Sequence, residues 1–189
     1  MNSRLSEIVN EIKEVRTTLF SAVGGLTQKE FDKKPDPGQW SVGEILHHIY
    51  LFETQIARLL ARQVEKAKKR GLGADPNDGS LIRSLDRFAL ETTERKLKAP
   101  PSLEPRQGIE KKKLLELLQH SRSELLDIVS EASSYDLSEL IFPHPTFGRL
   151  NMYEWILIVG KHDNRHKTQI ENVLNKCSPA AGSKLYLKD

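Results

Sequence analysis

The sequence has few of the features that mark secreted, membrane or nucleic-acid-binding proteins. Its 189 residues include one cysteine, Cys177, so no internal disulfide can form and nothing indicates an oxidising compartment. No apolar run is long enough to span a bilayer, and the N-terminal stretch lacks the apolar core of a signal peptide. The net charge of +3 is too small to indicate a nucleic-acid partner by itself. We expect a cytoplasmic protein without a membrane or nucleic-acid partner.

Amphipathic helical patterns account for most of the chain. Apolar residues recur at helical spacing over residues 3–20, 42–70, 109–132 and 151–175, and alternating segments are almost absent. A capping-box pattern at Thr27 predicts a short extra helix before the second long one. These patterns predict an all-α fold, a four-helix bundle that needs no β-strand.

The chain length suits one domain, which we expect to span residues 1–177, followed by a C-terminal tail, 178–189. A long charged insertion, residues 71–105, separates the second and third long helices. It begins with a loop, continues with a weakly helical pattern over 81–99, and ends with prolines that predict an extended chain. The sequence leaves open whether this insertion covers a functional site.

The last long helix carries two histidines on its apolar face. At about 100° per residue, Trp155, His162, His166 and Gln169 fall within roughly 40° of one meridian. A neutral imidazole buried there must find hydrogen-bond partners or a metal ion. At positions i and i+4 the two rings lie about 6 Å apart at Cβ, close enough to share one cation. The ordinary alternative is that backbone carbonyls or water satisfy both rings.

The other histidines differ in their expected surroundings. On the second long helix, His48 lies about 60° from the centre of the apolar face, at its edge, and His47 lies about 160° away, on the opposite side. We therefore expect His47 on the surface. His120 is assigned to solvent by the same geometry, and His144, between two prolines, is expected to be structural.

If the second and last long helices face each other, His48, His162 and His166 can converge on one divalent ion. Three neutral imidazoles with an open fourth position suit zinc or another borderline metal such as nickel, and the open position admits water or a substrate atom. The metal would lower the pKa of a bound water or thiol. Because the fourth position is open to such a ligand, the pattern favours a catalytic metal site over a purely structural one.

Three segments resemble the DinB-like superfamily of metal-binding four-helix-bundle proteins: WSVGEILHH (40–48), PHPTFGRL (143–150) and HDNRHKTQI (162–170). In that family one histidine follows the tryptophan by eight residues and two come from an H-x-x-x-H in the last helix, which are His48, His162 and His166 here. The resemblance implies a homodimer. In characterised branches it implies transfer or isomerisation reactions that use a low-molecular-weight thiol such as bacillithiol or mycothiol.

Three functions remain open at this point. The first is metal-dependent transfer of a low-molecular-weight thiol to a small electrophile, with Arg165 and Gln169 as candidates to hold an anionic substrate or orient a ligand. The second is a metal-dependent hydrolase, with Glu44 as a better-placed carboxylate than Asp163. The third is a non-catalytic dimeric bundle, metal-stabilised or metal-free, that acts as a binding module.

Overall fold

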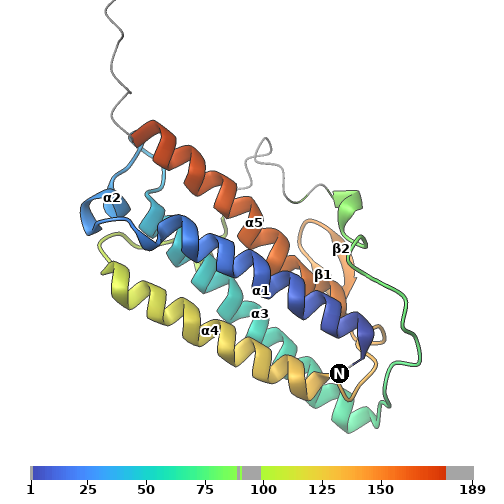
Figure 1. Cartoon of the computed structure of the whole chain (residues 1–189). Coiled ribbons are helices and arrows are strands. Elements are labelled where there is room, and N and C mark those ends of the chain that lie inside the picture. Colours follow the sequence, from blue (N-terminus) through green and yellow to red (C-terminus); the bar gives the residue numbers. More distant parts are fainter. Residues whose placement is uncertain (1, 89, 91–98, 178–189) are drawn as a thin grey trace, which may run out of the picture.

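Four long helices lie side by side in the computed structural model, which describes residues 2–88, 90 and 99–177 (Figure 1). They are α1 (Ser3–Gly24), α3 (Val42–Arg70), α4 (Lys111–Ala132) and α5 (Met152–Cys177). Helix α1 packs against α5, and α3 packs against both α4 and α5. The predicted all-α four-helix bundle is confirmed. None of the described helices is long and apolar enough to cross a bilayer.

Capping boxes set where two of the helices begin. Helix α2 (Gln28–Asp32) is the predicted short extra helix, and it begins with reciprocal hydrogen bonds between Thr27 and Glu30. Ser41 and Glu44 form the same arrangement at the start of α3. In both boxes the polar side chains satisfy backbone N–H groups that the first helical turn leaves unpaired. The beginning of α3 matters for the site because His48 lies in its second turn.

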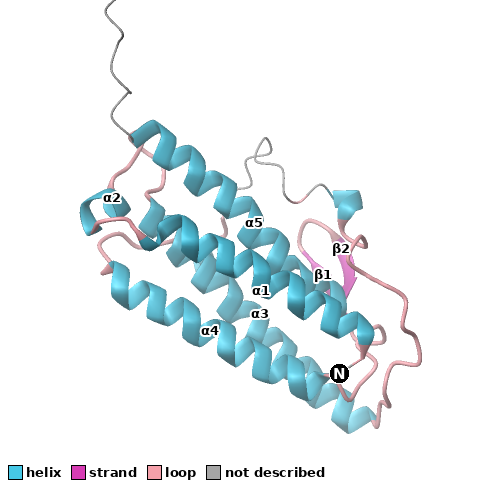
Figure 2. Cartoon of the chain, viewed as in Figure 1, coloured by secondary structure: helices cyan, strands magenta, loops and turns pink. Residues whose placement is uncertain are grey.

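A short β-hairpin interrupts the helical chain, so the expectation that no strand is needed is wrong. Strand β1 (Ile141–His144) pairs antiparallel with β2 (Gly148–Asn151), as Figure 2 shows. Each strand has four residues, too few for an alternating pattern to be recognised in the sequence. Nδ1 of His144 accepts hydrogen bonds from the N–H groups of Thr146 and Phe147, which gives this histidine the expected structural role.

The described part of the insertion contains two single 3-10 turns, η1 (Asp86–Phe88) and η2 (Pro101–Leu103). The proline-rich stretch that was expected to be extended therefore turns once at η2. About half of the weakly helical pattern, residues 89 and 91–98, lies outside the described residues, as does the predicted tail.

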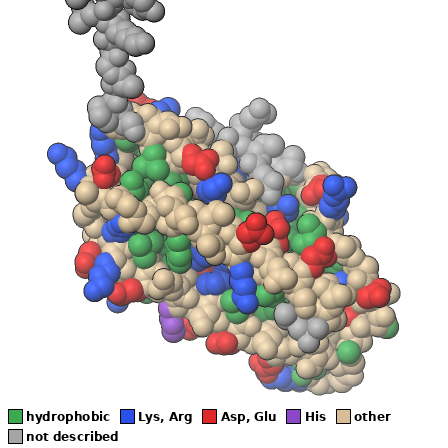
Figure 3. Space-filling view, viewed as in Figure 1, with side chains coloured by type: hydrophobic (Ala, Val, Ile, Leu, Met, Phe, Trp, Pro, Cys, Tyr) green, Lys and Arg blue, Asp and Glu red, His purple; other side chains and the backbone are tan. Residues whose placement is uncertain are grey.

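The apolar core is divided into two clusters. The first combines the N-terminal halves of α1 and α5 with the C-terminal halves of α3 and α4, and includes Ile8, Ile12, Leu60, Leu125 and Ile156. The second combines the opposite halves, and includes Leu19, Ile49, Leu118 and Ile170. Between the clusters, each long helix contributes one buried charged side chain: Arg16, Glu53, Arg122 and Asp163. The surface is different, because Lys or Arg and Asp or Glu are interspersed on the face drawn in Figure 3.

Candidate metal centre

The three histidines that the sequence singled out as ligands meet in the structure. His48 comes from α3, and His162 and His166 come from successive turns of α5. Nε2 of His162 lies 3.2 Å from Nε2 of His48 and 3.2 Å from Nε2 of His166. The ligand atoms that the three side chains offer all lie within 4.8 Å of one another. We call this group the histidine triad.

Hydrogen bonds at the far nitrogen orient two of the rings. Nδ1 of His48 donates to the backbone carbonyl of Leu103 at 2.9 Å. Nδ1 of His166 donates to Oε1 of Gln169 at 2.7 Å. Because both acceptors are oxygen atoms without a proton, Nδ1 of each neutral ring carries the hydrogen and Nε2 carries the lone pair.

Aromatic rings hold the triad from the sides. The ring of Phe52 stacks on His162, with centroids 3.9 Å apart and planes inclined by 14°. The ring of Trp40 lies 5.1 Å from that of His48, which gives the tryptophan of the sequence motif a place in the site. Stacking positions His162 in place of a hydrogen bond, since its buried Nδ1 has no partner among the described residues.

The donor set of the triad fits a cation. The Nε2 lone pairs of His48 and His166 both face Nε2 of His162. The His162 ring can donate one Nε2 proton to only one of them, so the other lone pair is left without a hydrogen. Burial lowers the pKa of all three histidines, that of His166 to about 3, so the rings are neutral at neutral pH. A tetrahedral zinc ion with Zn–N bonds of about 2.0–2.1 Å separates its nitrogen ligands by about 3.3–3.4 Å. The two short nitrogen separations in the triad are 3.2 Å.

A family model described as the DinB superfamily matches residues 11–170. The chain belongs to the DinB superfamily. This superfamily is metal-binding, and the residues that the DinB resemblance singled out are the ones that meet in the triad.

Two further comparisons found similar proteins. The uncharacterised protein YuaE of Bacillus subtilis is 26% identical to this DinB protein over 171 residues, which cover 88% of this chain and 97% of YuaE. The crystal structure of TT2238, a four-helix bundle protein, has a TM-score of 0.56 and 20% sequence identity, and the match covers 89% of this chain and 98% of that one. The second likeness shows the fold.

In this DinB protein the insertion positions one ring of the triad. Its residues 101–106 lie along α3, where the carbonyl of Leu103 accepts the hydrogen bond from His48 and the N–H of Arg106 donates to Nδ1 of His47 at 2.8 Å. His47 is therefore only 8% exposed, and the prediction that it lies on the surface is wrong. Helical geometry assigned that face of α3 to solvent, but the insertion covers it.

The hydrogen bonds of Glu44 lie outside the triad. The two oxygens of Glu44 accept hydrogen bonds from the Ser41 N–H at 2.8 Å and from Lys34 at 2.9 Å. Burial acts to raise the pKa of Glu44, but these hydrogen bonds outweigh it and the pKa lies below its ordinary value. A role for Glu44 as a general base would require the capping box to open. Nη1 of Arg165 donates to the carbonyl of Leu90 at 3.5 Å.

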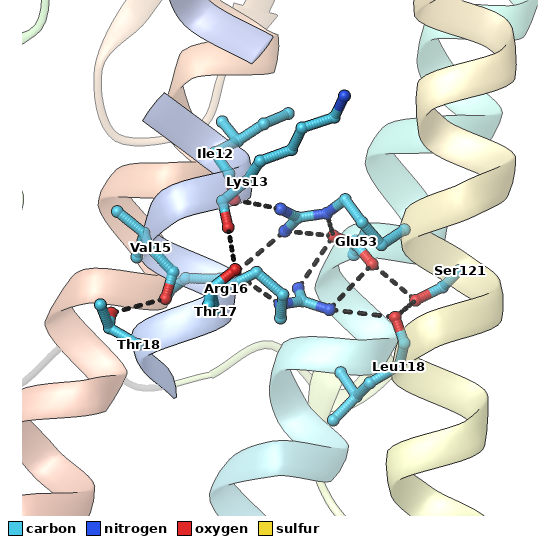
Figure 4. A network of polar contacts seen from close by, with 11 residues as sticks. Ile12, Lys13, Val15, Arg16, Thr17, Thr18, Glu53, Leu118 and Ser121 are labelled. Carbon is cyan, nitrogen blue, oxygen red and sulfur yellow. Dashed lines mark hydrogen bonds and ion pairs between the residues drawn. The ribbon is translucent and has the colours of Figure 1, made fainter. Parts of the chain in front are cut away.

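Sequence reasoning missed a buried layer of charges, part of which Figure 4 shows around Arg16 and Glu53. Glu53 accepts hydrogen bonds from Arg16 at 2.9 Å, from Arg122 at 2.7 Å and from Ser121 at 2.5 Å. Asp163 accepts from the same two arginines, both at 2.9 Å. The two cations and two anions balance, and together they join all four long helices. We call this group the charged layer.

The charged layer fixes the register of the helices that carry the triad. Asp163 directly follows His162, so its ion pairs hold α5 at the level of the ligands. A signal for the layer was present in the sequence, because each charge interrupts an apolar stripe. Glu53, for example, lies between Ile49 and Ile56 on the buried face of α3. Charged residues at such positions are almost never buried unless they are paired.

The metal-free protein is expected to lose stability as the pH falls below about 6.5. A histidine in the unfolded chain binds a proton near pH 6.5, whereas burial lowers the pKa of His166 to about 3 in the folded protein. Between these values the unfolded chain binds more protons, so the free energy of unfolding falls with decreasing pH, by on the order of 1 kcal/mol per pH unit for each such histidine. Urea denaturation of the metal-stripped protein between about pH 5 and pH 8 measures the slope.

Two variants test the origin of this slope. His166→Gln removes one of the buried titrating groups and is expected to make the slope shallower. His120→Gln is the control because its side chain is 72% exposed, and it is expected to leave the slope unchanged. Equal slopes in the wild type and in His166→Gln would contradict the assignment of this pH dependence to the buried histidines.

Proposed function

We propose that the protein binds one divalent ion, zinc or nickel, through His48, His162 and His166 and transfers a low-molecular-weight thiol to a small electrophile. The observation that carries the proposal is the pair of Nε2 lone pairs that face His162, fixed by the Nδ1 hydrogen bonds of His48 and His166. When bound, such an ion lowers the pKa of a coordinated thiol, so that a thiolate nucleophile exists at neutral pH.

In the proposal, residues around the triad orient its rings and attract the thiol cosubstrate. Leu103 and Gln169 hold two ligand rings in the tautomer that presents Nε2. Phe52 stacks on His162, and Trp40 lies against His48. Arg165 lies close enough for its charge to contribute to the lowered pKa of His162 and His166, after burial and the neighbouring imidazoles. In the proposal this positive charge attracts an anionic group of the thiol cosubstrate.

Thiol transfer is favoured over hydrolysis because no carboxylate of the described residues joins the triad. A hydrolase that uses metal-bound hydroxide is helped by a carboxylate that accepts and returns the proton of water. Glu44 is engaged in its capping box, and Asp163 is engaged in the charged layer. Ionisation of a thiol by a metal needs no such base.

A conjugation assay tests the proposal. Protein purified without an affinity tag is loaded with zinc or nickel and mixed with monochlorobimane and, in separate reactions, bacillithiol, mycothiol, glutathione, cysteine or coenzyme A. The thiolate sulfur forms a bond to carbon, chloride leaves, and the thiol proton passes to solvent. We expect a metal-dependent rate above background with at least one thiol, lost in His162→Ala and kept in His120→Ala.

The same assay separates the alternatives. No metal-dependent rate with any of these thiols would contradict thiol transfer. Triad variants that lower the melting temperature and the metal content, while no turnover appears, would support a non-catalytic metal-stabilised module. We also propose a homodimer, which rests on the family resemblance, and sedimentation equilibrium of the metal-loaded protein tests it.

Gln169→Ala is expected to weaken divalent metal binding about 10- to 100-fold, since groups that orient a ligand ring typically contribute this much. The variant removes the acceptor for the Nδ1 hydrogen of His166 and leaves the three ligands in place. Competition with a chromophoric chelator measures the change in affinity. Asn172→Ala, at an exposed position of the same helix, is the matched control and should bind metal as the wild type does. Wild-type affinity in Gln169→Ala would refute the orienting role.

A further inference from the structure

A second candidate site lies at the other end of α3, away from the triad. A cavity of about 420 Å³ opens between the last turns of α3 and the β-hairpin. Lys66 lies eighteen residues after His48, which corresponds to about 27 Å along the helix axis. The volume is within the range of small-molecule sites, roughly 300–1,000 Å³.

The cavity is strongly cationic. Lys66, Lys69 and Arg70 line it from α3, Arg149 lines it from β2, and Glu139 is the one carboxylate among the described lining residues. None of the four cations forms an ion pair with a described residue, whereas Lys68 on the same helix pairs with Glu65 and Glu131. Like charges at i, i+3 and i+4 repel each other, so an anion between them is stabilised.

Gln63 lies at the wall of the cavity. Its side chain is 96% buried, being 4% exposed, and lines the cavity. Its amide forms no hydrogen bond with a described residue, and its polar atoms reach the solvent of the cavity. A ligand in the cavity can therefore form a hydrogen bond with this amide. Basic residues in the last turn are also stabilised by the helix dipole, but that effect does not explain Arg149, which lies on β2.

The remaining wall is apolar. Leu140 and Ile141 line the cavity, and Ile141 is 45% exposed. A ligand that fits both walls has a doubly charged anionic group and a small apolar part. We propose that this cavity binds a soluble organic phosphate monoester, with the phosphate on Lys69, Arg70 and Arg149, a polar atom on Gln63, and the organic group on Leu140 and Ile141. An arginine on one wall suits a phosphate because it can donate two parallel hydrogen bonds.

Isothermal titration calorimetry with phenyl phosphate tests the proposal on the full-length protein. We expect saturable binding of one molecule per chain, weaker binding of inorganic phosphate, and no binding of phenol. The double variant Lys69→Ala/Arg149→Ala is expected to bind phenyl phosphate at least tenfold more weakly. Lys112→Ala removes an exposed cation on α4 and should bind as the wild type does.

A further variant separates ligand binding from folding. Gln63→Leu keeps the side-chain volume but removes the amide, so it is expected to weaken phenyl phosphate binding several-fold while the melting temperature of the ligand-free protein stays close to the wild-type value. Absence of saturable binding at millimolar phenyl phosphate would overturn the proposal, as would equal affinity in the double variant. A protein that sediments with phosphatidic acid vesicles but does not bind phenyl phosphate would also overturn the proposal, because that result would assign the cavity to a lipid headgroup.

Discussion

Glu53→Ala is expected to lower the free energy of unfolding by about 3–5 kcal/mol, the cost of breaking a buried ion pair by removing one partner. The side chain of Glu53 is fully buried and accepts hydrogen bonds from Arg16, Arg122 and Ser121. Without it, two buried guanidinium groups share one carboxylate, Asp163, and an uncompensated positive charge remains in the middle of the bundle. Urea denaturation of the metal-free protein at neutral pH measures the change.

An exposed carboxylate on a neighbouring helix provides the control. Glu124 pairs with His120 at 3.4 Å, and its side chain is 57% exposed. Glu124→Ala is expected to change the free energy of unfolding by less than about 1 kcal/mol, as is usual for surface pairs. If Glu53→Ala cost no more than Glu124→Ala, the charged layer would not be a coupled structural element.

His166→Ala is expected to weaken divalent metal binding by at least about 100-fold, more than the loss of a group that only orients a ligand. The change removes one of the three Nε2 donors and leaves His48 and His162, which then cannot surround an ion on three sides. The same loss is expected for His48→Ala and His162→Ala. Competition with a chromophoric chelator at neutral pH gives the affinities.

His144→Ala distinguishes loss of a ligand from loss of any packed histidine. Its ring lies 4.4 Å from that of Phe147 and 5.1 Å from that of Trp155, so it is packed as the triad rings are, but in the hairpin. This variant should bind metal with wild-type affinity. Wild-type affinity in His166→Ala as well would show that the triad is not the metal site.

The helices could be predicted from the sequence because local chemistry determines their ends. Helix α3 spans Val42–Arg70 as predicted, since Ser41 and Glu44 cap its first turn and Gly71 ends it in the left-handed conformation, with φ of 64°. The pairing of His162 with His166 could also be predicted from the local sequence, because positions i and i+4 share one helical face. His48 was separated from His47 by helical face and by the resemblance to the DinB-like family, and the structure brings His48 to the pair.

The parts that could not be predicted depend on contacts between residues far apart in the chain. Helical periodicity shows which face of α3 is polar, but it does not show whether solvent or another segment covers that face. The insertion covers His47, and Leu103 reaches His48 across 55 residues. The charged layer joins residues that are even further apart in the sequence, since 147 residues separate Arg16 from Asp163. A charge within an apolar stripe indicates burial, but it does not identify the partner.

The central claim is that three imidazoles from α3 and α5 hold one divalent ion. Elemental analysis of the untagged protein, expressed with zinc and nickel in the medium and dialysed before measurement, tests it most directly. The expected result is one ion per chain in the wild type and none in the triple variant His48→Ala/His162→Ala/His166→Ala. The same metal content in both proteins, whether one ion or none, would contradict the claim.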